Sequence, residues 1–220
     1  REQQLAVEER LDAVRAQKAQ LPEDQYYTQL EPVLVDMARL GARIDAVAGK
    51  AIADGRLVGA VVLVMRNGVT VHHRAYGLAD REAGQPLAED AIFRLASCSK
   101  TIVSVAALAL VDQGRLRLDD RVTRWLPRFT PTTSDGYRPD ITIHQLLTHT
   151  AGLSYSFLEP ADGAYRRANV STGLDQPGLT MQEELRRIER AGLAYPPGTS
   201  WQYSVAIDVL GAVIEAVTQR

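Results

Sequence analysis

The sequence predicts a mixed α/β fold, with a β-hairpin between a helical N-terminal stretch and a long, mostly helical C-terminal stretch. Two β-rich runs, Leu57–Met65 and Val69–Tyr76, are separated by Asn67-Gly68, a dipeptide that favours a two-residue hairpin turn. Apolar residues recur at helical spacing before this hairpin and again from residue 97 onward. These observations indicate one antiparallel pair of strands among several helices.

The first 40 residues are predicted to be helical and to form an appendage to a main domain of residues 41–220. Apolar residues recur there at helical spacing among charged ones: Val7, Leu11, Val14, Leu21, Leu30, Val33, Leu34, Met37 and Leu40. Pro22 and Pro32 are expected to mark helix starts or a break between helices. We expect this segment to serve in packing or in binding a partner, because it carries no catalytic pattern.

A second helix is predicted over Ile44–Ala53, leading into the hairpin of residues 57–76. The first strand shows little alternation of apolar and polar residues, which suggests that both of its faces are covered. His72 and His73 lie on the return strand, one on each face. Since no carboxylate or cysteine pattern accompanies them, we interpret both as structural rather than as metal ligands.

The most informative motif is Ser97-Cys98-Ser99-Lys100, which precedes a predicted helix over Thr101–Gln113. One helical turn separates Ser97 from Lys100, so the hydroxyl and the amine share a face. A serine nucleophile needs a group that takes its proton, and a lysine can help only if burial or other cations lower its pKa. The alternative from these four residues alone is an ordinary helix start, with Ser97 as N-cap and Lys100 solvated.

Composition narrows the function classes. A net charge of −2 without a basic stripe argues against nucleic acid as a partner, and no apolar stretch reaches 18 residues, so we expect no membrane span. The single cysteine, Cys98, excludes an intramolecular disulfide. The chain begins at Arg1 without a signal-like segment, which suggests a processed or trimmed product. We expect a cytoplasmic location, with the periplasm as the alternative.

Four segments, in order, resemble motifs of the serine β-lactamase and penicillin-binding-protein superfamily, and in particular of class C β-lactamases and family VIII carboxylesterases, the closest match. They are Phe93–Lys100, Leu108–Leu126, Ile141–Leu153 and Pro197–Ser204. The resemblance covers about residues 42–220 and implies an antiparallel sheet flanked by helices, with an inserted mostly helical domain. Family members continue with further strands that carry a third motif and a second oxyanion N–H. We therefore expect this chain to hold the N-terminal part of the domain, without the C-terminal strands.

The resemblance implies a bacterial serine hydrolase that cleaves short-chain carboxylic esters through an acyl-enzyme on Ser97. Lys100 and Tyr203 would form the proton-transfer pair, Tyr155 would bind substrate, and no metal or cofactor would take part. Class C enzymes have Tyr-x-Asn where this chain has Tyr203-Ser204-Val205. Because valine offers no hydrogen bond, this departure favours ester over lactam.

Two other functions stay open: a β-lactamase or D-alanyl peptidase, and a non-catalytic lactamase-like scaffold that binds a partner. The expected partners are a small ester substrate and either a helix-mediated oligomer or a missing C-terminal portion.

The remaining conspicuous residues are predicted to be structural. His149 lies in a stretch that the family uses structurally, Cys98 is expected to fill core space on the buried side of its helix, and Trp201 is expected to pack beneath the Tyr203 loop. Trp125 is predicted to lie in the core. Irregular loops are predicted near residues 127–140, 160–178 and 195–200.

Overall fold

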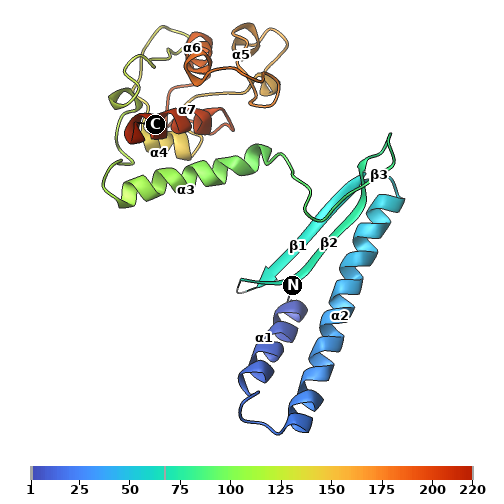
Figure 1. Ribbon diagram of the computed structural model, residues 1–220. Coiled ribbons are helices and arrows are strands. Elements are labelled where there is room, and N and C mark those ends of the chain that lie inside the picture. The colour runs from blue at the N-terminus through green and yellow to red at the C-terminus, as the bar shows by residue number, and fades with distance from the viewer. Residues whose placement is uncertain (1, 67, 220) are drawn as a thin grey trace. The chain divides into compact units, whose positions relative to one another are not determined.

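The computed structural model describes residues 2–66 and 68–219 and divides into two compact units, Arg1–Phe93 and Arg94–Arg220 (Figure 1). The first unit contains two helices and an antiparallel sheet, and the second is helical. This combination confirms the predicted mixed fold class. Within the described ranges, no helix combines the length and the apolar character needed to cross a membrane.

The first unit begins with a helical hairpin of α1 (Glu2–Ala16) and α2 (Glu23–Ala53). Leu11 and Val14 of α1 pack against Tyr26 and Val33 of α2 in a small core. Pro22 is the N-cap of α2, as a helix start requires, whereas Pro32 lies inside the helix and does not end it.

Helix α2 also passes without a break through residues 40 and 41, where the sequence suggested a domain boundary, and contains the separate helix predicted over 44–53. The helix is continuous because its N-terminal part packs on α1 and its C-terminal part packs on β2.

The sheet consists of three strands, β1 (Gly59–Arg66), β2 (Val69–Asp80) and β3 (Gln85–Pro86). They lie in the order β1-β2-β3, and each neighbouring pair is antiparallel. This confirms the predicted hairpin, although Asn67 of its turn lies outside the described residues; Gly68 has a φ of +78°. Gly59 pairs with Gly77, and a Cβ at either position would lie 2.3 Å from a carbonyl oxygen. In the described structure Leu63 and Met65 are 53% and 54% exposed, so the expected cover on both faces of this strand is not seen.

A polar network joins α2 to β2 within the first unit. The Tyr76 hydroxyl donates to Asp45 Oδ1 at 2.6 Å, and Arg74 Nη1 donates to Asp45 Oδ2 at 2.7 Å. His72 Nε2 lies 2.9 Å from the same Tyr76 hydroxyl, and His73 Nε2 lies 3.1 Å from the carbonyl oxygen of Glu89. Burial and the hydrogen bond to Asp45 raise the pKa of Tyr76 to about 12. Both histidines therefore have protein partners in this unit, and the described residues contain no group of three His, Cys, Asp or Glu side chains that could hold a metal ion.

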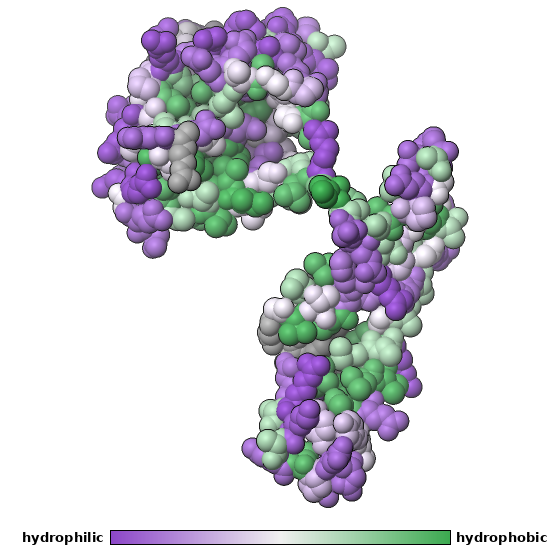
Figure 2. All heavy atoms as spheres, viewed as in Figure 1, coloured by the Kyte–Doolittle hydropathy of each residue, from purple (hydrophilic) through white to green (hydrophobic). Residues whose placement is uncertain are grey.

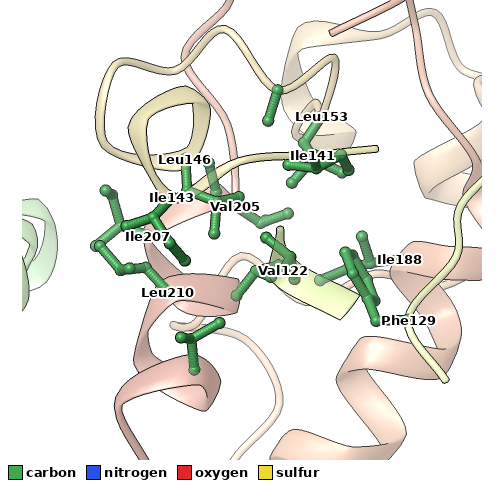
Figure 3. Packing of buried hydrophobic residues seen from close by; sticks show 14 of the residues in the cluster. Val122, Phe129, Ile141, Ile143, Leu146, Leu153, Ile188, Val205, Ile207 and Leu210 are labelled. Atoms are coloured by element: carbon green, nitrogen blue, oxygen red, sulfur yellow. The ribbon is translucent and has the colours of Figure 1, made fainter. Parts of the chain in front are cut away.

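The core of the second unit forms around α7 (Ala206–Thr218), which packs against α3 (Ser99–Asp112) and α4 (Ile143–Leu147). Figure 3 shows Ile207 and Leu210 of α7 meeting apolar side chains from several other segments. Helix α3 matches the helix predicted from residue 101. Its Ile102, Val105 and Leu108 are about half exposed or more, and Figure 2 shows the apolar surface along this helix.

Short helices and caps fix the segments between these elements. Thr142 and Gln145 form a reciprocal capping box at the start of α4, with hydrogen bonds of 3.2 and 2.9 Å. Thr180 caps α6 (Met181–Ala191), which ends at Gly192 with a φ of +78°. The predicted irregular regions are confirmed, except that 160–178 contains the short helix α5 (Ala164–Arg167). Single 3-10 turns occupy Ala96–Cys98, Val122–Arg124 and Ser156–Leu158.

Candidate active site

Ser97 lies in the 3-10 turn of Ala96–Cys98, immediately before α3. The N-cap of α3 is Cys98, without a side-chain cap hydrogen bond, so Ser97 does not act as the helix cap that the sequence left open. Ala96 holds a φ of +45°, a left-handed conformation that a non-glycine residue rarely adopts. Such local strain is often found where a backbone presents a reactive side chain.

Tyr203 contacts this serine directly. Its hydroxyl donates to Ser97 Oγ at 2.7 Å, joining residues 106 positions apart in the sequence. The loop that carries Tyr203 is fixed to the segment after α4, since Gln202 N donates to the carbonyl oxygen of His149 at 3.0 Å and Val205 N donates to that of Ser154 at 3.3 Å. Backbone hydrogen bonds before and after Tyr203 in the sequence therefore fix the position of its phenol ring.

Lys100 lies beside two tyrosine rings. Its Nζ is 5.1 Å from the centre of the Tyr203 ring and 5.4 Å from that of Tyr155. Burial by itself would lower the pKa of Lys100, but hydrogen bonds and electrostatic attraction to Tyr155 and Tyr203 outweigh it and raise that pKa above its ordinary value. The lowered pKa that a lysine base would need is therefore not found, and Lys100 is a cation at neutral pH.

Tyr155 is buried, with 3% of its surface exposed. Its ring lies 5.5 Å from that of Tyr203 and stacks on Phe157 at 4.7 Å. Burial raises the pKa of Tyr155, which keeps its hydroxyl protonated. The structure thus places this predicted substrate-binding residue against Lys100 and Tyr203.

His149 also lies against Tyr203. The two rings are 4.9 Å apart, and the backbone N–H of Ser204 lies 3.3 Å from His149 Nδ1, which accepts its hydrogen bond. Burial and the nearby charge of Lys100 lower the pKa of His149, which favours the neutral ring. The same Nδ1 lies 3.3 Å from the Ser204 hydroxyl oxygen, so His149 holds the residue that follows Tyr203.

A pocket of about 480 Å³ opens beside Ser97 and Lys100, entirely within the second unit. Its wall includes Asp208, in the first turn of α7, which the sequence analysis did not select. Burial raises the pKa of Asp208, and the charge of Lys100 opposes that rise. The sequence showed only an acidic residue in the first turn of a mostly apolar helix, and such a residue also fits a favourable helix dipole.

Comparison with known proteins identifies the family. A model of the beta-lactamase family matches residues 44–220, most of the chain. The chain belongs to the beta-lactamase family.

Esterase EstB from Burkholderia gladioli is 53% identical over 184 residues, which cover 84% of this chain and 47% of EstB. Lovastatin esterase from Penicillium rubens is 32% identical over 191 residues, covering 80% of this chain and 46% of that enzyme. Among solved structures, EstCE1, described as a hydrolase with promiscuous acyltransferase activity, has a TM-score of 0.81 at 44% identity and covers 84% of this chain and 49% of its own. The chain thus spans about half the length of these members of the beta-lactamase family.

Val205, two residues after Tyr203, is 1% exposed and packs in the core shown in Figure 3. Its side chain can offer no hydrogen bond to a ligand.

Two predictions near the site are wrong. Cys98 is exposed rather than buried, because it lies on the turn before α3 and the buried residues of that helix come later, at Ala107 and Leu110. Trp201 is 64% exposed rather than packed beneath the loop. The Trp201 ring lies edge-on to the His149 ring, with the ring centres 6.4 Å apart. Trp125 packs against the core as predicted.

Proposed function

We propose that this protein is a serine hydrolase that cleaves carboxylic esters of short-chain acids through an acyl-enzyme on Ser97. The observation that carries the proposal is the 2.7 Å contact between the Tyr203 hydroxyl and Ser97 Oγ, with the Lys100 cation beside the same phenol. A nucleophile and a group that moves its proton are the parts that acyl transfer requires. The esterase names of two relatives support the same reaction class.

In the proposed mechanism, Tyr203 is the base and Lys100 is its electrostatic partner. The raised pKa of Lys100 favours the protonated amine over the free amine that could accept the serine proton. To act as the base, Tyr203 must first lose the proton that it donates to Ser97 Oγ in this structure; its oxygen then accepts the Ser97 proton as Oγ bonds to the ester carbonyl carbon. Tyr203 then gives this proton to the leaving alcohol as the carbon–oxygen bond of the ester breaks. Water attacks the acyl-enzyme by the same route, releasing the acid and restoring Ser97.

The Ser97 backbone is suited to assist at the carbonyl oxygen. Ser97 lies in the turn that opens α3, where unpaired N–H groups and the positive end of the helix dipole favour negative charge. The tetrahedral intermediate carries its negative charge on the former carbonyl oxygen. We assign the Ser97 N–H as one donor to that oxyanion.

Ester is favoured over lactam as substrate because of Val205. An amide or lactam substrate presents a polar group to the asparagine of the second motif in class C enzymes, and here that position is a buried valine. A valine side chain packed in the core offers a substrate amide no hydrogen bond, and an ester needs none at this position.

Active-site labelling of the full-length protein tests the proposal. A fluorophosphonate probe should attach to Ser97, as located by peptide mass spectrometry, and Ser97→Ala should remove both labelling and turnover of p-nitrophenyl butyrate. Ser99→Ala, two residues away, is the matched control and should retain both. Attachment to Ser99 or Cys98 would refute the assignment, and an unlabelled protein would indicate a binding scaffold. Faster turnover of nitrocefin than of the butyrate ester would make it a lactamase.

A further inference from the structure

Helix α2 has a face that is covered over the C-terminal half of the helix and open over the N-terminal half. Residues that recur at alternating steps of four and three lie along one seam of a helix. One such seam of α2 passes through Gly41 and Asp45. There β2 covers it, because a Cβ at Gly41 would lie 3.9 Å from His72 Nδ1 and Asp45 accepts hydrogen bonds from two β2 side chains. In Figure 1 the strands lie beside the later part of α2, and α1 lies beside its first part.

The open part of this seam is formed by Tyr27, Glu31, Leu34 and Ala38, with Val35 at its side. All five residues line a groove of about 560 Å³. Tyr27, Leu34 and Val35 are 55%, 47% and 41% exposed. The groove therefore presents accessible apolar side chains around one carboxylate, that of Glu31.

The helical hairpin that carries this groove has a small core of its own. Within the described residues, its buried cluster consists of Leu11, Val14, Tyr26 and Val33. A core of this size contributes little stability by itself, and small folded units commonly gain more through association. The groove also precedes residue 44, where the match to the family model begins. The open seam thus lies outside the part of the chain that matches the family.

The charges of α2 indicate what can cover the groove. Glu31 lies in the seam, and the exposed Arg39 and Arg43 follow it on the same helix. If two copies of α2 pair antiparallel about Val35, a residue four positions before this centre lies beside the residue four positions after it in the other copy. Glu31 of each copy then lies beside Arg39 of the other, and Tyr27 lies beside Arg43. A parallel pair would place Glu31 against Glu31, which is unfavourable.

Arg39 is free to make this contact. Its side chain is 75% exposed, and its ion pair with Asp36 is long, at 3.4 Å. A guanidinium has five N–H donors, so it can bind a second carboxylate without releasing the first. A two-fold axis makes the contact twice, since residue i of one copy meets residue j of the other and the reverse.

We propose that this groove binds the same groove of a second copy, so that the protein is a two-fold dimer joined by antiparallel α2 helices. The contact removes Tyr27, Leu34 and Val35 of both copies from water, which supplies affinity. The two Glu31–Arg39 pairs set the direction and the register of the helices. The inference does not depend on the proposed hydrolase function.

Sedimentation velocity and light scattering of the full-length protein, over a wide range of concentrations, test the dimer. Wild type should have twice the mass of one chain. Leu34→Glu places a second carboxylate in the groove of each copy and should raise the dimer Kd about 100-fold or more. Val47→Glu is the matched control, because Val47 is 71% exposed on the same helix and does not line the groove. This control should leave the dimer Kd close to wild type.

A charge exchange tests the antiparallel arrangement, and it also serves if Leu34→Glu does not fold. Glu31→Arg and Arg39→Glu should each raise the dimer Kd about tenfold, since each turns two attractive pairs into repulsive ones. The double variant restores opposite charges and should recover most of the wild-type affinity. Circular dichroism checks that each variant keeps its helices.

Three results would overturn the proposal. A wild-type protein that is monomeric at every concentration would leave the groove to another segment of the full-length protein. A dimer that folded Leu34→Glu leaves intact would form through a different surface. A double charge variant that is no tighter than either single variant would exclude the antiparallel contact between Glu31 and Arg39.

Discussion

Replacing Tyr203 with phenylalanine removes a single oxygen from the site, the one that lies 2.7 Å from Ser97 Oγ. The aromatic ring stays and keeps its neighbours, His149 at 4.9 Å and Tyr155 at 5.5 Å. The backbone hydrogen bonds of Gln202 and Val205 that hold the loop do not involve the phenol. The substitution therefore separates proton transfer from the positioning of the ring.

The expected loss of kcat/KM follows from the role of the phenol. General acid–base catalysis by a positioned side chain contributes about 10²–10⁴-fold, or about 2.7–5.4 kcal/mol of transition-state free energy. The cost to folding should be much smaller, because one hydrogen bond contributes about 0.5–1.5 kcal/mol. Tyr203→Phe should thus be a folded protein with very little activity.

Initial rates with p-nitrophenyl butyrate and urea unfolding monitored by circular dichroism measure the two quantities. Tyr165→Phe is the matched control, since Tyr165 is buried and its hydroxyl donates to the carbonyl oxygen of Gly192 at 3.1 Å, apart from Ser97. This control should lose about 1–3 kcal/mol of unfolding free energy and retain wild-type kcat/KM. If Tyr203→Phe kept more than about a tenth of wild-type activity, general acid–base catalysis by this phenol would be refuted.

Three further outcomes are expected. Lys100→Ala should lower kcat strongly, and the double variant with Tyr203→Phe should be little worse than either single variant, because residues that act as one unit are non-additive; additive losses in log kcat would contradict the pairing. The pKa of Lys100 is raised in the folded state. Protonated Lys100 should therefore contribute fully to the free energy of unfolding below the unfolded-state pKa of about 10.4, and this contribution should be lost as the pH rises through the folded-state pKa. Urea unfolding from pH 8 to 11 should therefore show a steeper alkaline decline for wild type than for Lys100→Met, and parallel curves would contradict this. Val205→Asn should lower the unfolding free energy by about 1–3 kcal/mol, because it buries an amide in an apolar core; an unchanged melting temperature, measured by calorimetry, would show that the amide finds a partner.

Local patterns predicted the elements that depend on neighbouring residues. The β-hairpin, the helix after Ser97 and the start of α2 at Pro22 were all predicted from short-range spacing and turn chemistry. The sequence also indicated that Ser97 and Lys100 would share a face, because one helical turn fixes that relation. The resemblance to known motifs added Tyr203 to the predicted site residues, and in the structure its hydroxyl lies 2.7 Å from Ser97 Oγ.

Features that depend on distant residues could not be predicted in this way. The direction of the Lys100 pKa is set by Tyr155 and Tyr203, 55 and 103 positions away in the sequence. Cys98 and Trp201 are both exposed, although both side chains are apolar. Which residues of a segment are buried depends on the tertiary contacts of that segment, and hydrophobicity alone does not predict those contacts. The unbroken course of α2 past residue 40 depends on its two packing partners, α1 and β2.

The network between α2 and β2 fixes the tautomer of one imidazole. Tyr76 has a single hydroxyl proton and gives it to the Asp45 carboxylate, which can only accept. The short contact with His72 must therefore be donated by the ring, so Nε2 carries the proton and, in the neutral ring, Nδ1 carries the lone pair. His72 Nδ1 lies 3.9 Å from the position that a Cβ at Gly41 would occupy, an ordinary van der Waals distance. One proton of Tyr76 thus determines which nitrogen of His72 donates in this network.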